Sequence, residues 1–170
     1  MIFVTVGTHE QPFNRLIKAV DELKVQKHLS DEVFMQIGYA DYLPEACSYE
    51  RFVPHPRMDE LMCKADIVIT HAGPGSIFHC LKYDKVPVVV PRQPGYSEHI
   101  DLHQVRFTKF LESKGTIIAV YDTQFIKNVL AQYTRCRTPS RYPVNENLKY
   151  FTKRIDDICN GFFSNTDSAV

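Results

Sequence analysis

Residues 65–77 contain the pattern that decides the fold, a short apolar run followed by two closely spaced glycines. They read Ala65-Asp66-Ile67-Val68-Ile69-Thr70-His71-Ala72-Gly73-Pro74-Gly75-Ser76-Ile77. The β-branched run at Ile67–Thr70 predicts a buried strand. Gly73 and Gly75 permit a tight turn because they lack a Cβ atom, and residues 76–83 then predict a helix. A strand, a glycine turn and a helix in this order are typical of an α/β fold.

The same alternation extends along most of the chain. Further apolar runs predict strands at residues 2–6, 33–37, 51–53, 86–90 and 116–120. Helical spacing of apolar residues predicts helices from Pro12 onward and at residues 58–64, 100–113 and 123–133. The strands lack clean polar alternation, which indicates burial on both faces. We therefore predict the α/β fold class, as a Rossmann-like parallel sheet with helices on both faces.

The domain organisation follows from a change in composition near residue 135. Residues 1–134 form the predicted α/β domain, and residues 135–144, which carry Pro139, Ser140 and Pro143, form a linker. Residues 145–163 predict a C-terminal helix, which either packs on the same domain or docks on a partner. Six cations and one acid lie between Arg135 and Arg154, and they suit either an anionic surface or plain solvent. Residues 164–170 predict a flexible tail.

Composition excludes several classes of protein. The 170 residues carry 20 basic and 20 acidic side chains, and this balance disfavours a general nucleic-acid binder. The N-terminus shows no signal-peptide pattern, and no apolar run approaches the length of a spanning helix. The five cysteines form no Cys-x-x-Cys pair, so we expect free thiols in a reducing cytosol. These features predict a cytoplasmic protein.

Polar residues and glycines concentrate in the loops after the predicted strands, where ligands bind in open parallel sheets. In the loop at residues 71–76, the amides of Gly75, Ser76 and Ile77 would be free at a helix start and suit a diphosphate. A plain strand-to-helix turn explains the same glycines. The loop lacks the dinucleotide fingerprint, because Phe78 stands where the third glycine belongs. This lack disfavours an NAD-dependent oxidoreductase.

A second polar loop, residues 91–104, is dense in groups that bind sugars and phosphates. His99 and His103 lie four residues apart, but no third metal ligand is evident. The sequence also contains no Asp-x-Asp motif of the kind that holds a nucleotide diphosphate through a divalent cation. We expect no metal and no cofactor, so that a bound diphosphate would be held by helix dipoles and cationic side chains.

Three blocks of this chain resemble a known family. They are residues 2–17 (IFVTVGTHEQPFNRLI), residues 65–77, and residues 88–92 followed by residues 98–104 (EHIDLHQ). They resemble bacterial exopolysaccharide and capsule glycosyltransferase subunits. That family is similar to the C-terminal half of the enzyme that adds N-acetylglucosamine to lipid-linked muramyl peptide. It is also similar to the small catalytic subunit of the dolichol-linked N-acetylglucosaminyltransferase.

The resemblance implies the C-terminal half of a GT-B glycosyltransferase and an inverting, metal-independent transfer from a UDP-sugar. It implies a lipid-pyrophosphate-linked saccharide as acceptor and a membrane-anchored partner that supplies the N-terminal half. The chain would then associate peripherally with the inner face of the cell membrane. The expected donor is UDP-galactose, with β-1,4 transfer in exopolysaccharide or capsule synthesis. N-acetylglucosaminyl transfer and a non-catalytic nucleotide-sugar-binding or activating subunit are the alternatives.

The resemblance also implies roles for individual residues. Those expected to bind the donor or line the cleft are Gly7, Thr8, Phe52, Val53, His71, Gly73, Pro74, Gly75, Ser76, His79, Arg92, Glu98, His99, Asp101 and Gln104. The loop at residues 73–76 would face the diphosphate, Phe52 and Val53 the uracil, and the residues from Arg92 onward the sugar and ribose.

Two of these expectations leave alternatives open. His79 stands where related enzymes often have a ribose-binding glutamate, and this departure leaves the identity of the sugar donor open. His9 and Glu10 are the expected catalytic residues, either of them acting as general base. Alternatively both only position substrate, and the base comes from the partner.

Overall fold

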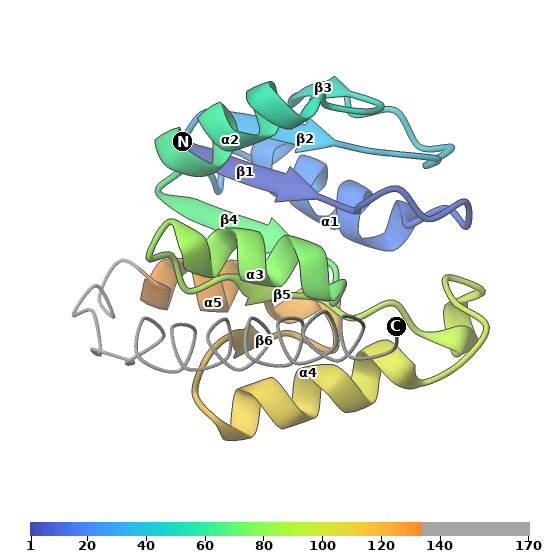
Figure 1. Cartoon of the computed structure of the whole chain (residues 1–170). Coiled ribbons are helices and arrows are strands. Elements are labelled where there is room, and N and C mark those ends of the chain that lie inside the picture. The colour runs from blue at the N-terminus through green and yellow to red at the C-terminus, as the bar shows by residue number, and fades with distance from the viewer. Residues whose placement is uncertain (134–170) are drawn as a thin grey trace, which may run out of the picture. The chain divides into compact units, whose positions relative to one another are not determined.

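The computed structural model describes residues 1–133, and their strands form one six-stranded, all-parallel sheet (Figure 1). The strands are β1 (Ile2–Thr5), β2 (Val33–Gln36), β3 (Ser48–Glu50), β4 (Ile67–Thr70), β5 (Val88–Val89) and β6 (Ile118–Ala119). Their order across the sheet is β3-β2-β1-β4-β5-β6. The predicted fold class is therefore confirmed. The linker, C-terminal helix and tail predicted beyond residue 134 lie outside the described residues.

Helices cover both faces of the sheet. They are α1 (Asn14–Val25), α2 (His55–Lys64), α3 (Pro74–Lys82), α4 (His103–Ser113) and α5 (Ile126–Tyr133), with short 3-10 turns η1 (Pro94–Tyr96) and η2 (Thr123–Phe125). Successive residues of β1 point to opposite faces. Ile2 and Val4 pack in one buried cluster with residues of α1 and α5, whereas Phe3 packs in a second cluster with residues of α2 and α3.

The strand order indicates where along the sheet a ligand is expected to bind. The chain builds the sheet outward from β1 to β3 and then returns to add β4 on the other side of β1. The loops that follow β1 and β4 therefore diverge at one point of the carboxyl edge, where open α/β sheets bind ligands. The two loops at this point are residues 6–13, after β1, and residues 71–73, after β4.

The third strand lies elsewhere than predicted. It spans Ser48–Glu50, and the predicted residues 51–53 follow it as a loop. The cause is the side chain of Asp21 on α1, which is fully buried. Its carboxylate accepts hydrogen bonds from the amides of Glu45, Ala46 and Cys47 at 2.8–3.0 Å. Because this anchor fixes the chain just before Ser48, pairing with β2 starts there.

Burial alone raises the pKa of the Asp21 carboxyl. The hydrogen bonds from the amides of Glu45 and Ala46, together with the one from the Tyr42 hydroxyl at 2.8 Å, outweigh burial. The pKa of Asp21 consequently lies below its ordinary value. A carboxyl of this kind stabilises the fold above its unfolded-state pKa, and the contribution disappears as pH falls through the folded-state pKa.

We expect Asp21→Asn to lower the free energy of unfolding at pH 7 by about 3 kcal/mol, because an amide nitrogen then faces backbone donors. The difference from the wild type should shrink as pH falls below the ordinary carboxyl pKa of 3.8. Urea unfolding at several pH values measures both effects. Glu22→Gln is the matched control, because Glu22 is the next residue of α1 and is exposed. Equal stabilities of Asp21→Asn and wild type at pH 7 would contradict the anchor.

Candidate functional site

The imidazole of His71 joins the loops after β1 and β4. It is 8% exposed and lies between two glycines, Gly7 and Gly73. A Cβ atom on Gly7 would lie 2.4 Å from His71 Cε1, and one on Gly73 would lie 2.2 Å from His71 Nε2. Gly7 also has a φ of +73°, which residues with a side chain rarely adopt. The two glycines are thus required by close approach to one ring.

His71 is neutral at physiological pH. Burial, and then the positive charge of Arg92, lower the pKa of this histidine to about 4. Its backbone amide donates to the Thr5 carbonyl at 3.2 Å, which continues the pairing of β4 with β1. An uncharged imidazole at this place packs as a flat spacer between two loops. His71 therefore shapes the expected donor site from inside.

The N-terminus of α3 lies next to the His71 ring. Gly73 is the N-cap, with an extended backbone and no side-chain cap, and Pro74 is the first helical residue. Gly75 is exposed, and an added Cβ there would meet nothing within 4 Å. Proline at the first position costs no hydrogen bond, and the amides that follow carry the positive end of the helix dipole. Of the three amides expected to be free, that of Ile77 is not, because it donates to the Gly73 carbonyl at 3.1 Å. An anion site at Gly75 and Ser76 stays a prediction, and the open space at Gly75 permits it.

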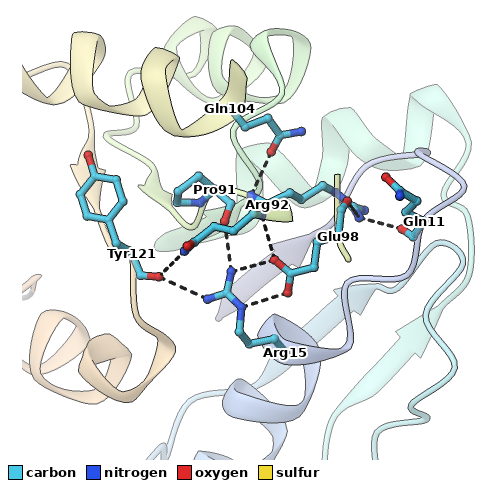
Figure 2. Close-up of polar contacts among 8 residues, drawn as sticks. Gln11, Arg15, Pro91, Arg92, Glu98, Gln104 and Tyr121 are labelled. Carbon is cyan, nitrogen blue, oxygen red and sulfur yellow. Dashed lines mark hydrogen bonds and ion pairs between the residues drawn. The ribbon is translucent and has the colours of Figure 1, made fainter. Parts of the chain in front are cut away.

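Arg92 is buried, and its guanidinium binds backbone oxygens (Figure 2). Nη1 donates to the Gln11 carbonyl at 2.7 Å, and Nη2 donates to the Val6 carbonyl at 2.9 Å. Nη1 also lies 3.3 Å from the Glu98 carbonyl oxygen. This arrangement differs from the expected phosphate contact, because a side chain that is 1% exposed does not face a ligand. Arg92 ties the loop after β5 to the loop after β1.

Glu98 and Gln104 are also held inside the protein. The Glu98 carboxylate accepts two hydrogen bonds from Arg15, each of 2.9 Å, and one from the Gln93 amide at 3.1 Å. The Gln104 side-chain oxygen accepts a hydrogen bond from the backbone amide of Arg92 at 3.1 Å. These contacts also differ from the expected sugar contacts. Figure 2 shows that Arg15 of α1 and the loop after β5 meet at this carboxylate.

His9, His99 and Asp101 lie nearer the surface. The rings of His9 and His99 have centroids 5.1 Å apart. His99 Nδ1 lies 3.1 Å from Asp101 Oδ1, and that oxygen accepts the His103 amide at 2.8 Å. The bond from the His103 amide is the main cause that lowers the pKa of Asp101. The structure therefore brings two expected site residues from different loops together.

An open hollow of about 400 Å³ lies beside the second loop. It is lined by Pro94, Ile100, Asp101, Leu102, His103 and Arg106. Ile100 is 81% exposed, so the hollow has an apolar rim next to polar groups. Its volume is within the range that small ligands occupy. Of the expected sugar contacts, Asp101 lies in its wall.

Phe52 and Val53 follow β3 at the carboxyl edge. Phe52 is exposed, and its ring contacts Tyr39 edge-on with centroids 5.1 Å apart. Val53 is half-buried and packs against the cluster of α2 and α3. Thr8 and Glu10 are exposed in the loop after β1.

His79 is bound to a residue that sequence reasoning missed. Its Nε2 lies 2.7 Å from the Asp59 carboxylate on α2, and the Tyr83 hydroxyl donates to the same oxygen at 2.7 Å. The hydrogen bond from Tyr83, and then the one from His79, lower the pKa of Asp59 to about 2. The spacing of His55 and Asp59 on one helix face was the available signal. Within residues 1–133, the other ring nitrogen of His79, Nδ1, has no hydrogen-bond partner.

Residues 1–133 contain no group of three His, Cys, Asp or Glu side chains placed to hold a metal ion. No helix among them combines the length and apolar character that crossing a bilayer requires.

The comparison with protein families decides the classification. The model of the glycosyltransferase family 28 C-terminal domain matches residues 1–160. The chain belongs to this family. The six-stranded sheet of this family 28 domain agrees with the C-terminal half of GT-B enzymes, as expected.

The relatives of this family 28 domain are longer proteins. The human UDP-N-acetylglucosamine transferase subunit ALG13 is 34% identical over 123 residues, which are 67% of this chain and 10% of that protein. The glycosyltransferase of kitacinnamycin shares 18% identity with a TM-score of 0.56, over 87% of this chain and 37% of that one. MurG of Acinetobacter baumannii shares 22% identity with a TM-score of 0.52, over 81% and 41% of the chains.

We expect Gly73→Ala to lower the free energy of unfolding by about 2 kcal/mol, because its Cβ would overlap the His71 ring. The loss should be smaller in the His71→Ala background, where the ring is gone, and a double-mutant cycle by thermal unfolding measures this coupling. Gly95→Ala is the control, since a Cβ there meets nothing within 4 Å. Additive effects of Gly73→Ala and His71→Ala would contradict the spacer role.

Proposed function

We propose that this family 28 domain binds a UDP-sugar donor at the carboxyl edge of β1 and β4. The observation that carries the proposal is the uncapped N-terminus of α3, with an open Gly75 beside the His71 spacer. Exposed amides and a helix dipole at this point favour a diphosphate. The loop at residues 73–76 would hold the diphosphate without a metal ion.

The reaction we propose is an inverting transfer of a sugar. The hydroxyl of a lipid-pyrophosphate-linked saccharide attacks the anomeric carbon of the donor. The bond from that carbon to the β-phosphate oxygen breaks, and its electron pair stays on UDP. The negative charge that develops on the β-phosphate is stabilised by the preorganised amides of Gly75 and Ser76.

Other groups of the site complete the donor contacts in this proposal. The backbone at Phe52 and Val53 takes the uracil, and the free Nδ1 of His79 takes a ribose hydroxyl. The sugar lies toward the hollow walled by Asp101. The acceptor proton goes to Glu10, which is exposed in the loop after β1, or to a base of another protein.

A second protein is part of the proposal. The chain spans 37% and 41% of the lengths of two solved glycosyltransferases. The human relative is itself named a subunit. We therefore propose a membrane-anchored partner that supplies the remaining half at the inner face of the cell membrane. The helix predicted at residues 145–163 is the candidate docking segment.

Two donors remain as candidates. The name of the human relative supports UDP-N-acetylglucosamine. The blocks at residues 2–17 and 98–104, which resemble exopolysaccharide glycosyltransferase subunits, support UDP-galactose and β-1,4 transfer in exopolysaccharide or capsule synthesis. A non-catalytic nucleotide-sugar-binding subunit would bind either donor without releasing UDP.

Gly75→Val tests the diphosphate site. A Cβ atom at Gly75 meets nothing within 4 Å, so we expect an unfolding temperature close to that of the wild type but a loss of UDP affinity of about ten-fold or more. Isothermal titration calorimetry with UDP and a chelator measures the affinity. Gly95→Val is the control, because Gly95 is equally uncrowded. Wild-type affinity in Gly75→Val would show that the diphosphate binds elsewhere.

The donor is identified by a release assay with the chain, its partner and a lipid-linked acceptor. We expect UDP release from either UDP-galactose or UDP-N-acetylglucosamine, with a clear preference for one, in the presence of a chelator. Release that requires a divalent cation would contradict metal independence. UDP binding without release from any donor would support the non-catalytic alternative.

A further inference from the structure

The loop after β1 fixes the orientation of the His9 ring. The backbone amide of Gln11 donates a hydrogen bond to His9 Nδ1 at 3.1 Å. A ring nitrogen that accepts a hydrogen bond carries no proton. In the neutral imidazole the single proton must therefore be on Nε2. Within residues 1–133 this Nε2 has no hydrogen-bond partner.

The residue that holds His9 is itself held by a buried cation. The Gln11 carbonyl accepts from Arg92 Nη1 at 2.7 Å, while the Val6 carbonyl accepts from Arg92 Nη2 at 2.9 Å. Figure 2 shows the contact between Arg92 and Gln11. Arg92 thereby fixes both ends of the segment that contains His9. A rotation of the His9 ring that frees Nδ1 would leave the Gln11 amide without this acceptor.

Burial and the nearby positive charge favour the neutral form of His9. Burial, then Arg92 and then His99 lower its pKa, and Glu10 opposes them. His71, which also interacts with His9, is itself neutral near pH 7 because its pKa is about 4. Asp101 lies 3.1 Å from Nδ1 of His99, whose ring contacts that of His9. His9 consequently presents an N–H group at physiological pH, and no lone pair.

We propose that His9 is a hydrogen-bond donor to a phosphate oxygen of the bound nucleotide, and that it is not the general base. This inference rests on the proposed function for its ligand. Its position supports a phosphate, because Gly7, two residues before His9, and Gly73, the N-cap of α3, lie against the same His71 ring. An unprotonated Nε2 is required of a base, and the bond from Gln11 excludes it. The base is then Glu10 or a group of the partner.

The experiment combines ring-nitrogen NMR with two matched variants. Labelled wild-type protein without ligand should show the Nε2–H form of His9 and a pKa below 6.5. In His9→Asn, the side-chain oxygen replaces Nδ1 as acceptor for Gln11, as in an Asx turn, but the Nε2–H donor is lost. In His9→Gln, the side-chain amide places a donor near the former Nε2.

We expect His9→Asn to weaken UDP binding about ten-fold or more at an unchanged unfolding temperature, and His9→Gln to stay within about three-fold of the wild type. The acid limb of the pH–rate profile should persist in His9→Gln. An Nδ1–H form of neutral His9, or loss of that acid limb, would overturn the inference while the proposed function stands. If wild-type protein with its partner binds no UDP, the proposed function and the phosphate contact both fail, whereas the NMR result still decides the protonation state.

Discussion

The burial of Arg92 is the constraint on which the carboxyl edge of this domain depends. Arg92 is 1% exposed, and an uncompensated buried charge is strongly unfavourable, so its guanidinium needs partners. Nη1 and Nη2 have them, whereas Nε has no hydrogen-bond partner among residues 1–133. Burial lowers the pKa of Arg92 to about 10, so the group remains charged at pH 7. The partners are carbonyls of the loop after β1 and of Glu98, and Glu98 in turn binds Arg15. Three segments distant in sequence are thus held in one arrangement.

The elements of the fold could be predicted from the sequence because local patterns determine them. Runs of β-branched residues located β1, β2 and β4 to within one residue, and glycines marked the turn before α3. The position of β3 could not be predicted in the same way. It depends on the Asp21 carboxylate binding amides 24 to 26 residues away, and no local pattern encodes that contact.

The sequence indicated which loops would form the candidate site better than it indicated what each side chain does there. The rule for open parallel sheets selects the loops after the strands, and the structure brings those after β1, β4 and β5 into contact. It does not tell a side chain that faces a ligand from one that faces the protein interior. Arg92, Glu98 and Gln104 have the chemistry of sugar and phosphate ligands, yet the structure uses them to hold loops. Asp59 was missed because its partners, His79 and Tyr83, come from another helix.

The packing of Gly7 and Gly73 on the two sides of His71 has an evolutionary consequence. The ring excludes a Cβ atom at both positions, and Gly7 is constrained in addition by its positive φ. A relative with a small residue in place of His71 is released from that exclusion at residue 73, while the left-handed backbone at residue 7 still disfavours a side chain. Positions 71 and 73 should therefore covary across family 28 domains, and position 7 should stay glycine.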